Sequence, residues 1–472
     1  MKTGAQYRQS LVDGRATFID GERVVDPGKH PLFKTPVDNV AASYDHSYST
    51  EPNAYNPLYM IPQSAEDLER RHEILGEAGM MGHITSTVLL AMITAAPELG
   101  DINPEYRRRI YDFMDYCRQD DARCAETITD AKGHRKLRPS QQDDPDFYVH
   151  VVDRNSDGVF ITGAKMHITG ASIVHELVVL PTKAMRPGEE QYAIACSVPV
   201  NAPGVTIINS TYAPRMPDAR HYPVSSKVNM AEGFVVFDRA FVPYERVFLD
   251  GEVAKASILA HSLGLWERAG AMHAGEGADR MVGLAALLAE ANGVANETHI
   301  RDRLSSMAII ATMARAGGEA AMANAVTNAD GFVSPSSLYI SATKYYMAEL
   351  NAQLIDILHD IAGTMLVDCP TLADLDNELI GPLLEEALGA VDGFSAEERM
   401  RLFHYVRDIT ADTYGGWSAV TRSLAGGGQY AQRLVTLKHY DMDRARDLAA
   451  RTVGLERGPR GKATKNAASA AD

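Results

Sequence analysis

The amino-acid sequence predicts an α+β protein in which a helical region, a region of short strands and a long helical bundle follow one another. The hydrophobic pattern is helical from Ser64 to about Cys124, and from Phe147 to Leu249 it changes to the period of two that is typical of strands. It is helical again, and rich in Ala, Leu and Met, from Ala254 to about Val453. No GxGxxG motif follows a predicted strand, so a doubly wound dinucleotide-binding fold is disfavoured.

The first helical region contains two clear helix signals. The segment Gly82–Ala96 carries almost no charge and is rich in Ile, Leu, Thr and Ala, which predicts a buried helix. A further helix is predicted from Pro104 to Tyr116, because proline is favoured at a first helical position and Asn103 is a good N-cap.

The middle region predicts a small antiparallel domain. Its short segments are rich in Val and Ile and are separated by Asp-Gly and Pro-Gly pairs, which indicates an antiparallel barrel or sandwich. The predicted strands are Phe147–Asp153, Val159–Gly163, Glu176–Pro181, Tyr192–Val198, Gly204–Asn209 and Gly233–Phe237.

The last region predicts long bundle helices over Ala254–Gly293, Glu297–Ala325 and Ser337–Gly363. The chain end is small and polar with several Lys and Arg residues, so it is expected to be disordered. We therefore expect an N-terminal helical domain over 1–140, a β domain over 141–253, a helical bundle over 254–458 and a tail over 459–472.

Composition excludes several classes of protein. The 472-residue chain has a net charge of −16, from 62 acidic and 46 basic residues, and this charge repels a nucleic-acid backbone. The four cysteines are too sparse for a disulfide framework and are expected to be reduced thiols. Met1–Arg15 is too polar for a signal peptide, and no apolar run reaches the ~20 residues of a membrane span. We expect a cytoplasmic protein without a membrane partner and without a metal site.

Five segments spread over the chain carry a family resemblance. The most specific reads GVFITGAKMHITGASIVHELVVLP. The five segments are Tyr7–Val25, Thr127–Arg138, Gly158–Pro181, Val235–Phe248 and Ala425–Arg433. Together they resemble the 4-hydroxyphenylacetate 3-hydroxylase / 4-hydroxybutyryl-CoA dehydratase family of flavoenzymes. The resemblance implies an acyl-CoA-dehydrogenase-like fold, with an N-terminal helical domain, a middle antiparallel β-barrel domain and a C-terminal helical bundle.

The family contains hydroxylases and dehydratases, and the residues here favour the hydroxylase type. The dehydratases hold a [4Fe-4S] cluster, which needs thiolate or imidazole ligands. By resemblance, those positions fall at about Gly82, Ser86, Trp266 and His273, and one histidine cannot hold a cluster. The acidic residue near the C terminus of the dehydratases is replaced by Arg422. A cluster-free enzyme is therefore expected.

The resemblance implies a two-component monooxygenase that uses FAD as FADH2, supplied by a separate flavin reductase, together with O2. It would hydroxylate an aromatic or related small molecule through a flavin C4a-hydroperoxide, which a dry pocket protects. A second hypothesis is a cluster-free flavin-dependent isomerase, dehydratase or dehydrogenase acting on an acyl-CoA-like substrate. A third is a non-enzymatic helical scaffold. The resemblance also implies a homotetramer.

The resemblance places the cofactor among residues from three parts of the chain. Lys132 and Arg135 are expected to pair with phosphate charge, and the three consecutive glycines to bring backbone amides close to the cofactor. A flexible turn is the alternative for the glycines, and a strand-end threonine is the alternative for Thr169. The expected cofactor-binding residues are Glu126, Thr127, Ile128, Lys132, Gly133, His134, Arg135, Thr169, Gly426, Gly427 and Gly428.

The catalytic candidates are His83, Glu126, His167 and His273. His83 interrupts an apolar helix and must find a partner or face a cavity. Burial of Glu126 would raise its pKa and suit it to acid–base work. His167 alternates with Thr169 and is expected to face the same side of an extended segment. For each histidine, a satisfied structural role is the alternative.

The expected substrate-binding residues are His83, Thr87, Pro181 and Thr182. By resemblance, the hydroxylases recognise a phenol through residues at about His83, Thr87 and Glu126, and all three positions differ here. The substrate is therefore not presumed to be 4-hydroxyphenylacetate.

Overall fold

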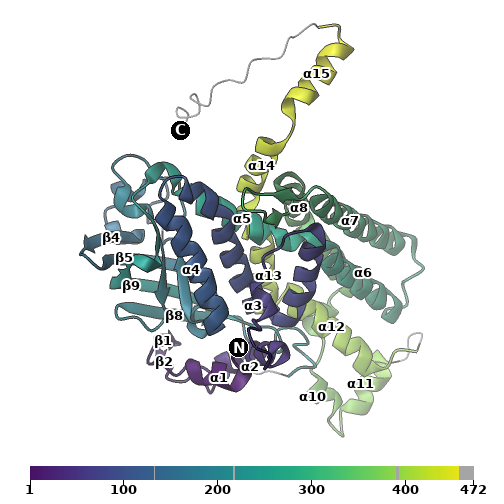
Figure 1. Cartoon of the computed structure of the whole chain (residues 1–472). Coiled ribbons are helices and arrows are strands. Elements are labelled where there is room, and N and C mark those ends of the chain that lie inside the picture. The colour runs from purple at the N-terminus through teal and green to yellow at the C-terminus, as the bar shows by residue number, and fades with distance from the viewer. Residues whose placement is uncertain (132, 216–217, 390–392, 456–472) are drawn as a thin grey trace.

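The computed structural model describes residues 1–131, 133–215, 218–389 and 393–455 (Figure 1). It has helices and sheets in separate layers, so the predicted α+β class is confirmed. Lys132 and the expected tail over 459–472 lie outside the described residues.

The N-terminal helices are α1 (Gly4–Ser10), α2 (Pro31–Ser47), α3 (Ala65–Gly100) and α4 (Pro104–Asp120). The expected cap of α4 is confirmed, because the Asn103 side chain accepts a hydrogen bond from the Glu105 N–H at 3.1 Å. The predicted burial of Gly82–Ala96 is also confirmed, since most of this segment contributes to the main hydrophobic core.

Helix α3 is broken inside by Gly79, whose φ of 66° and ψ of −168° are not helical. Glycine alone adopts this geometry without a Cβ penalty, so the kink depends on it. The helix is long and apolar enough to cross a membrane by length and composition, but 72% of its apolar window is buried inside the protein. This burial is typical of the core helix of a folded domain.

The strands form two larger sheets and one hairpin in the part of the chain that is described. The six-stranded sheet has the order β2 (Glu22–Arg23), β1 (Ala16–Ile19), β8 (Val205–Thr211), β9 (Ala231–Pro243), β5 (Gly158–Thr169) and β4 (His150–Arg154). The four-stranded sheet has the order β10 (Val247–Asp250), β7 (Ile194–Pro199), β6 (Glu176–Val179) and β3 (Cys124–Thr127). The hairpin is β11 (Val326–Thr327) with β12 (Val333–Ser334).

Most of these strand pairs are antiparallel, as expected, but β1 pairs with β8 and β3 pairs with β6 in parallel. The two larger sheets contact each other between β3 and β5 and between β7 and β9. Three strands, β1, β2 and β3, come from the first 140 residues, so the N-terminal region contributes to both sheets. Strand β3 matters most for function, because it carries Glu126 into the space between the sheet and the helices.

The C-terminal helices begin with α5 (Ser257–Ala269), the short η8 (Gly270–His273) and α6 (Ala274–Ala291). The predicted single helix over Ala254–Gly293 is therefore wrong in its continuity, since the α-helical turns stop at Gly270. The next helices are α7 (Thr298–Ala323), α8 (Ser337–Ala362), α9 (Met365–Asp368), α10 (Leu372–Leu375) and α11 (Gly381–Leu388). The last are α12 (Ala396–Thr410), α13 (Thr413–Leu424), α14 (Gly428–His439) and α15 (Met442–Thr452).

Helix α5 packs against α3 and joins the two helical regions. Trp266 on α5 is 1% exposed, and its indole N–H donates to Thr94 Oγ1 on α3 at 2.8 Å. This contact fixes the face of α5 that carries the neighbouring Glu267. Helix α14 packs against α8, whereas α15 extends away from the body of the protein (Figure 1).

Candidate active site

Two carboxyl groups from segments far apart in the chain meet in the interior. Glu126 lies on β3 and Glu267 on α5, and their side chains are joined by a hydrogen bond. Burial raises the pKa of Glu126 well above its usual range, the charge of Glu267 raises it further, and the Arg71 guanidinium opposes both effects. The carboxyl group of Glu126 therefore keeps its proton to a higher pH than an ordinary glutamate, and it is the donor in the hydrogen bond to Glu267.

Several groups favour the ionised form of Glu267. Burial raises the pKa of this carboxyl, but the Gly426 N–H donates to its Oε2 at 3.1 Å, and the charges of Arg268 and Lys344 also oppose the rise. The two glutamates thus share one proton, and such a pair is suited to general acid–base chemistry.

Arg71 on α3 is the cation on the Glu126 side. Its Nε donates to Ser86 Oγ at 3.1 Å and its Nη2 donates to Thr87 Oγ1 at 3.3 Å. Its guanidinium lies 5.2 Å from the centre of the Trp266 ring, and burial lowers the pKa of Arg71 to about 10. The structure therefore gives Thr87, an expected substrate-binding residue, the role of positioning a buried guanidinium.

Two further cations, Arg268 and Lys344, lie on the Glu267 side. Arg268 donates from Nη1 to the Gly426 carbonyl at 2.8 Å, but its buried Nε has no hydrogen-bond partner among the described residues. Burial lowers the pKa of Lys344 to about 8, although the charge of Glu267 acts against this shift. An anionic ligand near these groups would supply the missing partner.

The three expected glycines form the turn between α13 and α14. Gly426, Gly427 and Gly428 have φ angles of 80°, 93° and 69°, which side-chain-bearing residues rarely adopt. A Cβ on Gly426 would lie 2.6 Å from Arg268 Cγ. The turn is therefore held closely against α5, and two of its backbone groups bind Glu267 and Arg268. Binding of a cofactor by this turn remains a prediction.

We predict that Gly426→Ala lowers the free energy of unfolding by about 2–5 kcal/mol, from a left-handed backbone cost of about 1–2 kcal/mol and an overpacking cost of about 1–3 kcal/mol. Gly428→Ala is the matched control, because its φ of 69° is similarly costly but its Cβ would lie 3.7 Å from Leu424 Cδ2, an ordinary contact. Urea denaturation of both variants measures the difference. Equal losses would contradict the close packing of Gly426 on Arg268.

His83 lies on α3 after the kink and faces the short helix η8, where a Cβ on Gly270 would be 3.7 Å from His83 Cε1. Burial lowers the pKa of His83 to about 3, and the positive charges of Arg71 and His72 contribute to this shift. The imidazole is therefore neutral at physiological pH. It is able to accept or donate a hydrogen bond, but a catalytic role remains a prediction.

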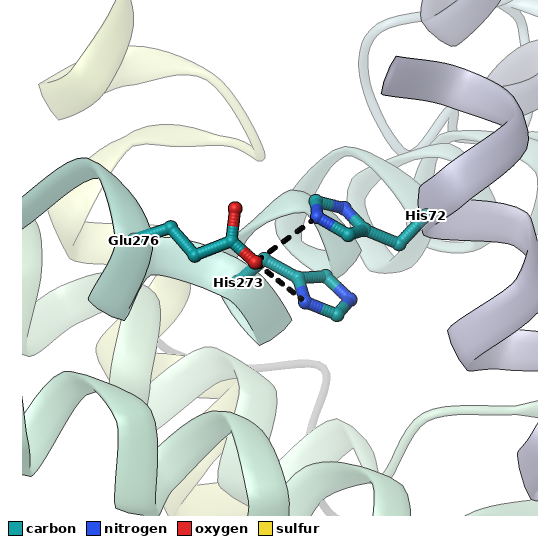
Figure 2. Close-up of side chains that lie close together, drawn as sticks. All are labelled: His72, His273 and Glu276. Atoms are coloured by element: carbon teal, nitrogen blue, oxygen red, sulfur yellow. Dashed lines mark ion pairs between the residues drawn. The ribbon is translucent and has the colours of Figure 1, made fainter. Parts of the chain in front are cut away.

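His273 ends η8 and stacks on His72 of α3, with ring centres 3.4 Å apart and an angle of 12° between the ring planes. Burial lowers the pKa of His273 to about 4, and the nearby His72 contributes. Glu276, in the first turn of α6, points between the two rings (Figure 2). This group of three side chains is called the His72–His273–Glu276 cluster below.

The expected alternation of His167 and Thr169 is wrong. Strand β5 shifts register against β9 between Lys165 and Ile168, and His167 has a φ of 61°, so the backbone is not extended there. His167 is exposed, while Thr169 Oγ1 donates to Glu232 Oε2 at 2.7 Å. Strand bulges of this kind redirect a side chain and are not visible in a period-two pattern.

Glu232 on β9 is a buried carboxyl that the sequence reasoning missed. It accepts hydrogen bonds from Thr169 and from the Trp417 indole N–H, the latter at 2.9 Å. Burial raises the pKa of Glu232, and its two hydrogen bonds and the charge of His167 oppose this rise. Thr169 thus has a side-chain partner and not the backbone partner that the alternative assumed, and its role in cofactor binding remains a prediction.

The chain after β3 and the chain after β6 are joined by a buried polar network. The Ile128 carbonyl accepts hydrogen bonds from Thr182 Oγ1 and from Lys165 Nζ, both at 2.7 Å. Lys165 also forms an ion pair with Asp130 at 2.7 Å and donates to the Leu180 carbonyl at 2.8 Å. Two further expected residues of this wall, Thr127 and Pro181, are buried.

The expected phosphate-binding loop is on the surface. Gly133, His134 and Arg135 are exposed, and the backbone of His134 exchanges hydrogen bonds with the Gln142 side chain. In the described part of this loop no side chain reaches the carboxyl pair. A role for it in cofactor binding is still a prediction.

A cavity of about 250 Å³ opens between α6, α8, α12 and α13. Arg280, Met281, Asn351, Tyr414 and Arg422 contribute to its lining. The Arg422 Nε donates to Ser418 Oγ at 3.2 Å. The lining of this cavity is mixed, because Arg280 and Arg422 stand beside apolar residues such as Met281, Ile355 and Ile409.

Sequence reasoning found Glu126 and missed its partners. Glu267, Arg268 and Lys344 lie on long amphipathic helices, where a charged residue ordinarily indicates a solvated face. One signal was present, since Glu267 and Arg268 follow the apolar run Leu263–Trp266 directly. Arg71 and His72 gave no such signal, because charged residues flank the pair, and Glu276 gave none because it stands between two glycines.

Comparison with known proteins places these features in a family. The model for the 4-hydroxyphenylacetate 3-hydroxylase N-terminal domain matches residues 3–249, and the model for the C-terminal domain matches residues 266–454. The chain is 27% identical to the 4-hydroxybutyryl-CoA dehydratase/vinylacetyl-CoA-Delta-isomerase of Clostridium aminobutyricum, over 97% of this chain and 100% of that protein. It is 28% identical to the oxygenase component of 4-hydroxyphenylacetate 3-monooxygenase of Thermus thermophilus, over 88% of this chain and 89% of that protein.

Solved structures of both kinds of enzyme are also similar to this protein. A crystal structure of the oxygenase component of 4-hydroxyphenylacetate 3-monooxygenase, complexed with FAD and 4-hydroxyphenylacetate, superposes with a TM-score of 0.86 at 25% identity and covers 96% of this chain and 98% of that one. A 4-hydroxybutyryl-CoA dehydratase from N. maritimus has the same fold, with a TM-score of 0.86 at 24% identity over 97% of this chain and 96% of that one.

Proposed function

The chain belongs to the 4-hydroxyphenylacetate 3-hydroxylase family, and we propose that it is the oxygenase component of a two-component monooxygenase that uses reduced FAD and O2. The observation that carries this proposal is the match of both family models together with the similarity to oxygenase components along most of the chain. These relatives are oxygenase components, and we infer that a separate reductase supplies the reduced FAD.

The residues of this structure fit a bound flavin. A dinucleotide brings a negatively charged pyrophosphate and a ring edge that accepts hydrogen bonds, and both need donors in a dry site. Arg268 has a buried Nε without a partner in the described chain, and Lys344 is a second cation near Glu267. Placing the flavin between β3, α5 and the turn at Gly426 would give the Arg268 Nε an anionic partner.

The proposed roles follow from the protonation states of the side chains. Reduced FAD, when bound, supplies the two electrons that O2 activation requires. The protonated form of Glu126 would donate its proton to an oxygen atom of the bound ligand, and solvent then returns a proton to Glu126. Glu267 accepts the hydrogen bond of Glu126 and holds its carboxyl group in place. His83 is neutral and orients a polar group of the substrate by a hydrogen bond. The apolar walls from α3 and β6 exclude water.

We assign recognition of an anionic group on the substrate to Arg71. Its guanidinium is buried beside Thr87 and Trp266, and these contacts fix its direction. A phenolate, or another acidic small molecule, would pair with the guanidinium of Arg71, whose hydrogen-bond partners in this structure are the neutral hydroxyl groups of Ser86 and Thr87. The buried cationic site thus favours an aromatic or related acid as substrate.

The assembly and the location are further parts of the proposal. A homotetramer is expected from the resemblance, and α14 and α15 present exposed apolar residues that a neighbouring subunit would cover, including Tyr430, Leu434, Leu437 and Leu448. A cytoplasmic location agrees with the reduced state of all four cysteines. The division of the chain at about residues 140 and 253 and a barrel-like middle domain are kept as proposals as well.

A second candidate function is a cluster-free isomerase, dehydratase or dehydrogenase on an acyl-CoA-like substrate. It is favoured by the similarity to the Clostridium aminobutyricum enzyme over the full length of that protein. The residues at the expected cluster positions oppose the dehydratase route, because Trp266 is buried and bonded to Thr94, and Gly82 and Ser86 offer no thiolate.

Oxygen consumption tests the proposed function. We expect O2 uptake when the protein is mixed with FAD, NADH and a generic flavin reductase, with a rate that rises when a suitable phenol is added. The reductase without this protein is the control for uncoupled flavin oxidation. If no compound in a panel of phenols changes the rate or yields a hydroxylated product, while acyl-CoA esters are converted without O2, the second candidate is correct.

A further inference from the structure

We propose that His72, His273 and Glu276 form a binding site for a single divalent transition-metal ion of the zinc or iron(II) class. The three residues come from two segments that are 200 positions apart, because His72 lies on α3 before the kink and the other two lie at the junction of η8 and α6. Two imidazoles and one carboxylate are a donor set that such ions favour. The site adjoins the proposed substrate pocket, because the charge of Arg71 acts on His273, but the proposed function assigns it no step.

The distances between the donor atoms fit one ion. Glu276 Oε1 lies 3.3 Å from His72 Nε2 and 3.9 Å from His273 Nδ1, and all three donor atoms lie within 4.8 Å of one another. Two donors at about 2.1 Å from one ion and at a tetrahedral angle are about 3.4 Å apart. Figure 2 shows the carboxylate oxygen on the edge where both imidazoles present a nitrogen. In the structure the two rings are stacked with an angle of 12° between their planes, so their in-plane nitrogen lone pairs do not converge. One ring has to turn out of the stack about its side-chain torsions to bind the same ion as the other.

No hydrogen bond ties the Nε2 atom of His273 to any described residue of the protein, although this atom is buried. The other ring nitrogen, Nδ1, lies 3.9 Å from Glu276 Oε1 and is the one that would bind the ion.

The surroundings of the His72–His273–Glu276 cluster determine how tightly we expect it to bind a metal ion. Glu276 has 57% of its side chain exposed, so an ion has an open path from solvent and room for water ligands. The charge of Arg71 opposes cation binding, because it lies close enough to lower the pKa of His273. His72, His273 and Glu276 offer only nitrogen and oxygen donors, so they lack the sulfur ligands of an iron–sulfur cluster. We therefore expect binding of a mononuclear ion with a Kd on the order of micromolar.

Cobalt(II) titration of the full-length, chelator-treated protein tests the site. We expect one equivalent of Co²⁺ to produce visible ligand-field absorption, Zn²⁺ to displace it, and the bound ion to raise the Tm because it links α3 to α6. His72→Gln and Glu276→Gln should each weaken the binding by at least tenfold. His299→Gln is the matched control, because this histidine is exposed on α7 and outside the cluster.

Circular dichroism and Tm in the presence of chelator show whether each variant is folded, so that a loss of metal binding is not confused with unfolding. The inference is overturned if the wild-type protein takes up no stoichiometric Co²⁺, or if His72→Gln and Glu276→Gln bind it as tightly as His299→Gln. None of these readouts requires flavin or substrate, so they are independent of the proposed oxygenase activity.

Discussion

Replacing Glu126 with glutamine should lower kcat by about 10²–10⁴-fold, the range that general acid–base groups supply. Glutamine keeps the shape and the hydrogen bond to Glu267 but has no proton to transfer. The affinity for reduced FAD should change little, since the cations beside the glycine turn remain. Steady-state kinetics with reductase in excess measure the effect. Glu73→Gln, an exposed carboxyl on the same helix as Arg71, is the control for a general loss of charge.

The pH dependence of activity follows from the direction of the Glu126 shift. Its pKa is raised, so the protonated form persists above the usual carboxyl range and is lost at higher pH. If the protonated form is the catalytic one, kcat is constant at low pH and falls as the pH rises through the raised pKa. A profile that instead rises over this range, or the same falling limb in Glu126→Gln, would contradict the assignment.

The pH dependence of the protein's stability should also reflect the raised pKa of Glu126. A raised pKa in the folded state means that the unfolded chain ionises first, at a pKa of about 4.3, and the folded state becomes less favourable as the pH rises. The stability linked to Glu126 is fully present below the unfolded pKa and is lost as the pH rises through the folded pKa. The Tm of Glu126→Gln relative to that of wild type should therefore increase as the pH rises from the unfolded pKa of about 4.3 through the raised pKa of the folded state.

Replacing Lys165 with methionine should lower the free energy of unfolding by about 3–5 kcal/mol, the cost of leaving one member of a buried ion pair alone. Lys165 is 1% exposed, its ammonium pairs with Asp130, and it also bonds the carbonyls of Ile128 and Leu180. Urea denaturation measures the loss. Because this lysine joins the chain after β3 to the chain after β6, the wall next to Glu126 should loosen as well.

The double variant Lys165→Met/Asp130→Leu is the informative control for this ion pair. It replaces both charges by apolar groups, so no buried charge is left without a partner, and part of the lost stability should return. If the double variant lost as much free energy of unfolding as the two single variants together, Lys165 and Asp130 would not be energetically coupled. The ion pair would then not explain the stability of this network.

The long elements of this fold could be predicted from sequence, and the short ones could not. Helices α4, α7 and α8 have many turns of one periodic pattern and a clear start, such as Asn103 before Pro104. Strands β1, β2 and β3 have two to four residues, which is too few for a period of two to be distinguished from chance. The break at Gly270 and the bulge at His167 depend on tertiary packing, which no local pattern records.

A site residue could be predicted from the sequence only where one short segment contains the information. Glu126 could be identified because its position within one motif and its expected burial already indicate a raised pKa. Its partners Glu267, Lys344 and Gly426 come from other helices, and their meeting depends on how α5, α8 and α13 pack together. The His72–His273–Glu276 cluster has the same origin, since its two segments are brought together by the contact between α3 and the bundle.

Isotopically labelled O2 tests the central claim most directly. The protein, a flavin reductase, FAD, NADH and a phenolic acid would be incubated under ¹⁸O2, and the product would be analysed by mass spectrometry. The account predicts one atom of ¹⁸O in each hydroxylated product, and loss of that product in Glu126→Gln. A product whose new oxygen comes from water, or conversion of an acyl-CoA ester without any use of O2, would contradict the assignment as a monooxygenase.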